Sequence, residues 1–260
     1  MNHYFQNLIN DRFIIISFVK QDLRARYRGS TLGIFWAILT PLGTTSIIAA
    51  VYSILWKTDI RYFVPYLFSG LVPWTYITSV CDSGTSAYMA SEGYIKQLSI
   101  HNEIFPVRAA TSTFINSLLF GLIAYFLMLL VLAPGMLSLW TLLLFPALLL
   151  YYVFGVSMAT IAASAQVYIR DYAPTQSLIL QALFYITPIL YDFNMMRDMG
   201  YSLIYTMNPF FYLIQIMRDS LMGQPANPKY WLVAACICLA VFAGSQIVFY
   251  KTNRKIVFRL

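Results

Sequence analysis

The sequence predicts an all-α integral membrane protein: six transmembrane helices, an N-terminal amphipathic interface helix and two short re-entrant helices before the last span. Of the 260 residues, 60% are hydrophobic and 10% are charged, whereas soluble domains carry about 25% charged residues. Uncharged runs are long enough to cross a bilayer, and basic residues gather between some of them. A core of this size cannot hide so much apolar surface. We therefore expect residues 1–260 to form a single transmembrane domain covered by lipid.

Charge-free runs locate the six spans. A helix needs about 20 residues to cross roughly 30 Å of hydrocarbon. The run from 109 to 169 is too long for one helix, and the turn signal Ala133-Pro134-Gly135 divides it. The expected spans are residues 32–56, 65–89, 107–132, 139–166, 174–191 and 230–250.

The distribution of Lys and Arg predicts the orientation. If the N-terminus is cytoplasmic, 12 of the 17 basic residues lie inside. Those twelve are Arg12, Lys20, Arg24, Arg26, Arg28, Lys96, Arg108, Arg170, Lys251, Arg254, Lys255 and Arg259, and the five outside are Lys57, Arg61, Arg197, Arg218 and Lys229. Because basic residues concentrate on the cytoplasmic side, we expect both termini in the cytoplasm.

The segment 11–28, before the first span, has the pattern of a basic amphipathic helix lying in the membrane interface. On a helix, an apolar face collects Ile15, Ile16, Val19, Leu23 and Tyr27, and the opposite face collects Ser17, Lys20, Gln21, Arg24 and Arg28. Asp22 and Arg26 lie off the polar stripe.

The segment 192–229, between the fifth and sixth spans, must start and finish on the same side of the membrane. Its uncharged stretch 199–217 is interrupted at Asn208-Pro209. Two short helices that dip back from the outer face satisfy both facts, provided that protein or a cavity covers them. A surface loop is the alternative, although the apolar residues of this stretch are poorly suited to water.

The sequence lacks the residues that energy conversion or catalysis would need. No Gly-x-x-x-x-Gly-Lys-[Ser/Thr] loop occurs, so the chain has no P-loop nucleotide site. We find no cluster of metal ligands and no Ser/His/Asp set within the spans. The spans hold almost no ionisable residue, and apart from Arg108 at the cytoplasmic end of span 107–132, Asp82 is the one candidate. We interpret it as a hydrogen-bonded structural residue or a group facing a wet vestibule, with ion coupling as the alternative.

Absence of an energy source suggests that a partner supplies it. The cytoplasmic loop 91–105 mixes polar residues with large apolar ones, among them Tyr94, Ile95, Leu98 and Ile104. Such side chains are unusual in a solvated loop, and they could dock a soluble subunit. A helix lying on the membrane is the alternative.

Three motifs carry a family resemblance. The stretch from Lys20 to Leu42 reads KQDLRARYRGSTLGIFWAILTPL, span two contains Leu71-Val72-Pro73-Trp74, and Asn208-Pro209-Phe210 is followed by the stretch 216–223, IMRDSLMG. Together they resemble the permeases of polysaccharide-exporting ABC transporters, which serve O-antigen, capsule and teichoic acid export. O-antigen export is the closest match, and no motif separates it from teichoic acid or capsule export.

The resemblance implies a homodimer that joins two copies of a P-loop nucleotide-binding subunit in the bacterial inner membrane. This chain would hold no cofactor; ATP and Mg would bind the partner, and no nucleic acid is involved. The interface helix and the loop at Tyr94, Ile95, Lys96 and Leu98 would contact the ATPase subunit. The dimer would enclose a channel for a polysaccharide linked to polyprenyl pyrophosphate. An outer gate would include Tyr205, Asn208, Pro209, Phe210 and Phe211.

Aromatic and basic residues are the candidates for substrate contact. Rings stack on the C–H faces of sugars, and 17% of the residues are aromatic. The lining candidates are Phe35, Trp36, Tyr52, Phe68, Trp74, Tyr76, Phe184, Tyr185 and Tyr191. Arginine binds phosphate with two parallel hydrogen bonds, so the pyrophosphate candidates are Arg24, Arg26, Arg28 and Arg108. Interface aromatic belts and anchoring to anionic lipid are the respective alternatives.

Two other functions remain open from the sequence. An ABC permease for a small, drug-like substrate is the first, although related permeases often carry large outer domains or fused ATPase domains. A membrane-integral enzyme or an ion-coupled carrier is the second, and the scarcity of charge within the spans opposes it. A neighbouring gene for a P-loop ATPase would separate these classes.

Overall fold

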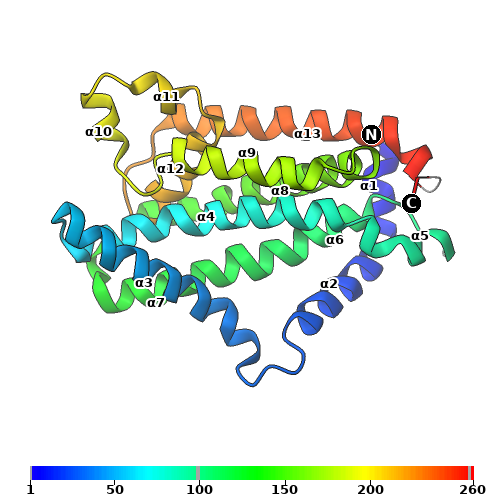
Figure 1. Ribbon diagram of the computed structural model, residues 1–260, viewed down its shortest axis with the longest axis horizontal. Helices are drawn as coiled ribbons and strands as arrows, with labels where there is room; N and C mark the ends of the chain where they lie inside the picture. Colours follow the sequence, from blue (N-terminus) through cyan, green and yellow to red (C-terminus); the bar gives the residue numbers. More distant parts are fainter. Residues whose placement is uncertain (1, 98–99, 257–258) are drawn as a thin grey trace.

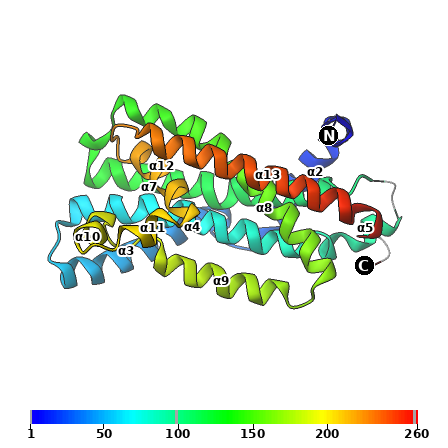
Figure 2. The same cartoon turned by 90° about the horizontal axis from the view of Figure 1, so that it is seen from above.

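Six helical rods run along the long axis of the computed structural model, which describes residues 2–97, 100–256 and 259–260 (Figures 1 and 2). Three rods are single helices: α4 (Ile60–Ser86), α9 (Tyr172–Ile186) and α13 (Pro228–Ile256). Two rods begin with a 3-10 turn: η1 (Gly33–Phe35) leads into α3 (Trp36–Trp56), and η5 (Leu139–Leu143) leads into α8 (Leu144–Tyr168). The remaining rod is continuous through α6 (Ile104–Thr113), η3 (Phe114–Leu119) and α7 (Phe120–Leu132). Shorter elements are α1 (Asn2–Asn10), α2 (Arg12–Arg26), η2 (Met89–Ser91), α5 (Glu92–Gln97), η4 (Pro134–Met136), α10 (Phe193–Asp198), α11 (Ser202–Thr206) and α12 (Pro209–Leu221). The described residues form no strand.

Within the described part of the chain, four helical stretches are long and apolar enough to cross a membrane: Gly33–Trp56, Ile104–Leu132, Leu139–Tyr168 and Pro228–Asn253. They match four of the expected spans. The other two expected spans correspond to α4 and α9. Helix α4 has 27 residues but carries many polar ones, and α9 has 15 residues, which cover only about 22 Å at 1.5 Å per residue. The chain is thus a multi-pass membrane protein, and the count of six spans stays a prediction.

Helix α4 lies at the centre of the bundle, where it packs against α3, α6, α7, α8, α9 and α12. Small residues allow its close approach to α8: a Cβ placed on Gly84 would lie 2.7 Å from the Cα of Ala159. Lipid provides no hydrophobic driving force between helices, so such close packing is a main source of their association. The position of α4 is therefore fixed along most of its length.

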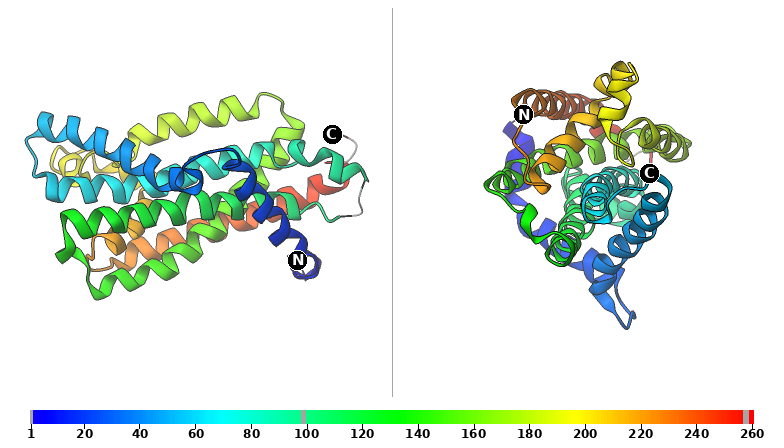
Figure 3. Two further views of the ribbon diagram at one scale, coloured as in Figure 1. Left: turned by 90° about the horizontal axis from the view of Figure 1, so that it is seen from below. Right: turned by 90° about the vertical axis from the view of Figure 1, so that its left-hand side faces the viewer.

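Both ends of the chain lie at the same end of the bundle, together with α5 (Figure 1). Helix α2 lies obliquely across that end (Figure 3), and its bounds fall inside the expected segment 11–28. The expected polar stripe of Ser17, Lys20, Gln21, Arg24 and Arg28 is exposed. The arrangement agrees with an interface helix at the side that holds both termini; the membrane position itself stays a prediction.

The segment 192–229 is helical and lies at the end away from the termini (Figure 1). It holds three helices, α10, α11 and α12, where the sequence suggested two. Asn208 caps α12 by accepting a hydrogen bond from the Phe210 N–H, and Pro209 is the first helical residue. Asparagine at the cap and proline at the first position favour the start of a helix, so the Asn-Pro pair begins α12. That these helices re-enter a membrane stays a prediction.

Candidate functional site

One face of α4 is polar and is not covered by another helix. Residues spaced three or four apart along a helix share a face. On α4 this face carries Thr75, Thr78, Ser79, Asp82 and Ser86, each half-buried or exposed. Helices α3 and α9 both pack against α4 and flank this face, as the view along the bundle shows (Figure 3). We call this face of α4, with the adjoining sides of α3 and α9, the polar trough.

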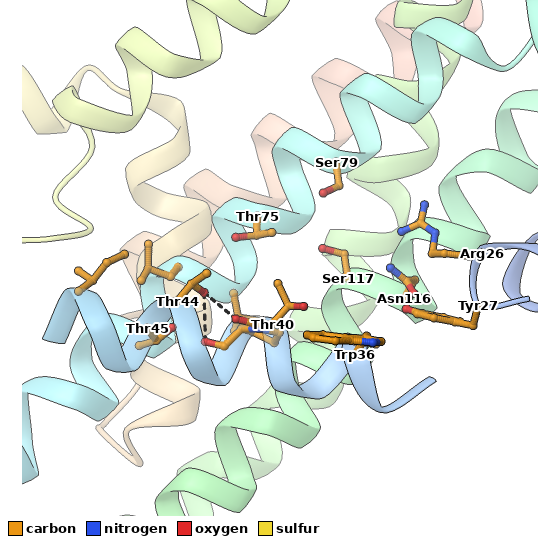
Figure 4. A pocket seen from close by; sticks show the side chains of 15 residues that line it. Arg26, Tyr27, Trp36, Thr40, Thr44, Thr45, Thr75, Ser79, Asn116 and Ser117 are labelled. Carbon is orange, nitrogen blue, oxygen red and sulfur yellow. Dashed lines mark hydrogen bonds between the residues drawn. The ribbon is translucent and has the colours of Figure 1, made fainter. Parts of the chain in front are cut away.

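The larger hollow of the trough, about 500 Å³, lies between α3, α4 and the rod α6–η3–α7. Hydroxyl and amide groups alternate with apolar surface along its wall, and Arg26, Tyr27 and Trp36 lie at one end (Figure 4). The polar lining residues are Thr40, Thr44, Thr45, Thr75, Ser79, Asn116 and Ser117. The hollow thus offers a ligand both apolar surface and hydroxyl groups.

A π-helix supplies two of those residues. Asn116 and Ser117 belong to η3, the π-helical turn within the rod from Ile104 to Leu132. Such turns are rare and occur often at functional sites. The Tyr27 hydroxyl donates a hydrogen bond to Asn116 Oδ1 and so links the end of α2 to this turn. Partial burial raises the pKa of Tyr27, so the hydroxyl keeps its proton at neutral pH.

The smaller hollow, about 290 Å³, lies between α4 and α9. Three aromatic rings form part of its wall: the Phe184 ring centroid lies 5.8 Å from that of Trp74 and 5.4 Å from that of Tyr185. Asp82 and Gln181 line the same hollow, and within the described residues the Asp82 carboxylate forms no hydrogen bond or salt bridge. Ring faces beside a carboxylate and an amide match the apolar and hydroxyl surfaces of a sugar.

The nine aromatic residues predicted to line a channel differ in how far they are exposed and in whether they line a hollow. Phe35, Trp36 and Tyr185 are exposed, with 63%, 49% and 65% of their surface accessible. Trp74 and Phe184 line the smaller hollow. Tyr52 and Tyr191 are half-buried and lie in neither hollow.

Phe68 and Tyr76 belong to the core of the subunit. Phe68 packs on Tyr125, and Tyr76 packs on Phe114 and Tyr151; both are essentially inaccessible. This burial argues against the expectation that they line a channel. Their spacing on α4 could not reveal it, because the covering rings come from distant parts of the chain.

The four arginines predicted to bind pyrophosphate also differ in their surroundings. Arg24 and Arg28 are exposed beside Lys20 along the polar stripe of α2, and Arg26 reaches the larger hollow. Arg108 instead forms a two-pronged ion pair with Asp22, with Nε at 2.8 Å and Nη2 at 2.5 Å from the carboxylate oxygens. Its charge is compensated within the subunit, which argues against a pyrophosphate-binding role. The pair explains why Asp22 lies off the polar stripe.

The ion pair between Asp22 and Arg108 gives a testable prediction. It joins α2 to α6, and the Arg108 guanidinium also lies 4.6 Å from the centroid of the Phe18 ring. Hydrogen bonds to charged groups contribute about 1.5–3 kcal/mol each. We expect Arg108→Leu to loosen α2, measured as faster proteolysis after Arg24 or Arg26 in the purified protein. The exchanged pair Asp22→Arg with Arg108→Asp should restore most of the protection, and equal cleavage in all variants would contradict the account.

The predicted ATPase-contact residues do not form one exposed surface. Tyr94 is 38% exposed and packs on Phe18 of α2, with ring centroids 5.2 Å apart. Ile95 is buried in a small core with Tyr88 and Phe105, so its surroundings argue against a direct contact with a partner. Lys96 is exposed and pairs with Glu92. Leu98 lies outside the described residues.

The predicted gate residues form a packed cluster at the far end of the bundle. Phe211 and Tyr205 are buried, with ring centroids 4.8 Å apart, and Phe193 packs on both. Phe210 contacts Trp74, and the Asn208 side-chain amide donates to Thr187 Oγ1 at 2.7 Å. Pro209 begins α12. The cluster ties the outer helices to the end of α9 and to α4.

Arg218 was expected only as one of the outside basic residues and as part of the stretch 216–223, and the structure gives it a buried position that the sequence did not indicate. It is 2% exposed. Its guanidinium donates to the Tyr66 hydroxyl at 3.0 Å and to the carbonyl oxygens of Pro188 and Ile189 at 3.0 and 3.2 Å. It also lies 3.9 Å from the centroid of the Tyr66 ring. Arg218 therefore anchors α12 to α4 and to the segment after α9. Arginine is usually exposed, and no local pattern marks this one as buried.

Apolar rods around a polar trough define a multi-pass membrane protein of the permease class. Residues 15–222 match the family model described as ABC-2 type transporter, a range that includes most of α2, the trough and the outer helices. The chain belongs to this family.

Curated relatives agree with this assignment. The chain is 28% identical over 206 residues to the O-antigen export system permease protein RfbA of Myxococcus xanthus, and the alignment covers 78% of each chain. Two proteins of the same name from Klebsiella pneumoniae are 26% and 25% identical over 218 residues, with 84% of this chain and 83% of each relative covered.

Proposed function

We propose that this chain is the channel-forming permease subunit of an ABC exporter that moves a polyprenyl-pyrophosphate-linked polysaccharide, an O-antigen chain, across the inner membrane. ATP hydrolysis in a separate subunit provides the energy. The polar trough is the observation that carries the proposal, and the similarity to O-antigen export permeases supports the choice of substrate.

Exposing the polar side chains of the trough to lipid would be energetically unfavourable unless a polar ligand or a protein surface covers them. Thr75, Asp82 and Ser86 are exposed on a helix among apolar rods, and polar groups without partners in hydrocarbon are strongly disfavoured. A second copy of the chain, facing the first, would close the open side and exclude lipid. The homodimer would then enclose a channel whose walls combine hydroxyl groups with apolar and aromatic surface, and a sugar polymer could exchange hydrogen bonds with the hydroxyl groups as it passes.

Basic groups at the terminal end of the bundle suit the lipid carrier. Arg24, Arg26 and Arg28 lie on or beside the exposed side of α2, and Arg26 reaches the larger hollow. A pyrophosphate arriving from the cytoplasmic leaflet would meet these guanidinium groups before the sugar chain enters the trough. The exposed face of Trp36 lies in the same hollow.

The ATPase subunit would bind the end that holds α2 and α5. Tyr94 of α5 packs on Phe18 of α2, and Arg108 joins α2 to the rod that borders the larger hollow. A displacement of α5 by the ATPase subunit would therefore be transmitted through direct contacts to α2 and to the rod α6–η3–α7. We propose this route for the coupling of ATP hydrolysis to the channel.

Replacing Tyr94 tests the docking surface. We expect Tyr94→Asp to weaken co-purification of the ATPase subunit at least tenfold, because a charge replaces a partly exposed ring, while the permease still reaches the membrane. Tyr201→Asp, at an exposed ring in the outer segment, is the matched control and should leave the complex intact. Retention of the ATPase subunit by the Tyr94 variant would place the dock elsewhere.

The substrate is tested in the assembled complex. Purified permease and ATPase subunit, reconstituted together in liposomes, should hydrolyse ATP faster when the lipid-linked O-antigen chain is added. Stimulation by small lipophilic cations with no response to the lipid-linked chain would favour a small-molecule exporter instead.

A further inference from the structure

The charge pattern of the trough distinguishes classes of polysaccharide. Helices α3, α4 and α9 are described completely, and their charged residues are Arg61 and Asp82. Arg61 lies in the first turn of α4, at the end away from the termini, and Asp82 lies near the opposite end. The other residues that line the smaller hollow are uncharged, whereas Arg26 of α2 lines the larger hollow. Any group that moves along the smaller hollow therefore passes one carboxylate in each subunit, and no cation lines that hollow.

The Asp82 side chain is placed to act on a passing chain. It is exposed, it lines the smaller hollow with Gln181 and Trp74, and within the described residues it pairs with no cation and accepts no hydrogen bond. Arg26 lines the larger hollow of the same trough, together with Ser79, and does not line the smaller hollow that holds Asp82. In a homodimer whose troughs face each other, two such carboxylates would border the channel at one level.

We infer that the trough selects uncharged polysaccharide chains and that Asp82 is the specificity-determining residue. The inference rests on the proposed function and narrows its substrate class. A neutral sugar can donate hydroxyl hydrogen bonds to the carboxylate, which accepts them well. A chain with a uronic acid or a phosphodiester in every repeat would bring a like charge to Asp82 at each step, and like charges at close range repel. The pyrophosphate of the carrier passes once per chain, whereas a polyanionic chain meets the barrier repeatedly.

Export of two chains by the same complex tests this inference. The permease and its ATPase subunit are expressed in cells without their own exporter, which make a neutral polymannose chain or a glucuronate-containing chain on polyprenyl pyrophosphate. The measured quantity is the ratio of anionic to neutral chain at the cell surface, each normalised to its lipid-linked pool. This ratio cancels losses of expression or folding that affect both chains equally. We expect the unaltered complex to favour the neutral chain.

Asp82→Asn should raise that ratio at least about fivefold, equivalent to ~1 kcal/mol of repulsion removed. Asp198→Asn, which removes the same charge from an exposed pair with Arg197, should leave it unchanged. Equal export of both chains by the unaltered complex, or an unchanged ratio in Asp82→Asn, would overturn the inference while leaving the proposed function intact. Export of neither chain would overturn the proposed function itself and the inference with it.

Discussion

Polysaccharide export is expected to fall at least tenfold when Thr75 is replaced by tryptophan. Thr75 lies midway along α4 and lines the larger hollow. An indole there would fill part of a 500 Å³ space and replace a hydroxyl by apolar surface. In a homodimer both walls of the channel would change together. The measurement is surface polysaccharide per exporter complex, with the amount of complex determined by immunoblot.

A matched substitution on an exposed face outside the trough separates blockage from misfolding. Leu239 of α13 is 66% exposed and lies outside both hollows. Leu239→Trp adds a comparable side chain without entering the trough and should leave export within about twofold of the unaltered complex, since interfacial and lipid-facing tryptophan is well tolerated. Equal export by both variants would show that the larger hollow is not on the path of the polymer.

Loss of Arg218 is expected to have the largest effect on stability. Its guanidinium satisfies the Tyr66 hydroxyl and two carbonyl oxygens. Arg218→Leu leaves these buried groups without their donor and should reduce the free energy of unfolding by roughly 3 kcal/mol or more. Unfolding of the purified permease in a denaturing detergent, followed by circular dichroism, measures the change.

Two further variants test why Arg218 is needed. Arg218→Lys keeps the positive charge, but an ammonium group lacks the planar set of N–H donors with which the guanidinium reaches its three acceptors. This variant should therefore recover only part of the stability. Arg197→Leu removes an exposed arginine and should change stability by less than about 0.5 kcal/mol. Equal stability of Arg218→Leu and the unaltered protein would contradict the assigned anchor.

The long apolar elements could be predicted from the sequence because hydropathy and length decide them locally. The expected spans 32–56, 107–132, 139–166 and 230–250 coincide with helices long and apolar enough to cross a membrane. Segment 11–28 contains α2, and the polar stripe of α2 is exposed as expected. The expected helix 174–191 ends at Ile186, five residues earlier than expected, because the backbone of Thr187 is extended.

The positions of individual site residues depended on tertiary contacts that no local pattern contains. Arg108 looked like a free cation because its partner Asp22 lies 86 residues away. Ile95 looked exposed in a loop, although Tyr88 and Phe105 cover it. The exposed residues Trp36, Tyr185 and Arg26 are in place for substrate contact, which remains a proposal. The spacing of Thr75, Ser79, Asp82 and Ser86 was the available signal for the trough.

Photo-cross-linking from within the trough tests the central proposal most directly. The photoreactive residue p-benzoylphenylalanine replaces Thr75 in one variant and Leu239, exposed on α13 outside the trough, in another, and cells are irradiated during export. The account predicts a polysaccharide adduct on the permease for Thr75, detected as a glycan-positive shift in gel mobility, and none for Leu239. An adduct from Leu239 with none from Thr75 would contradict it, because the polymer would then pass outside the trough.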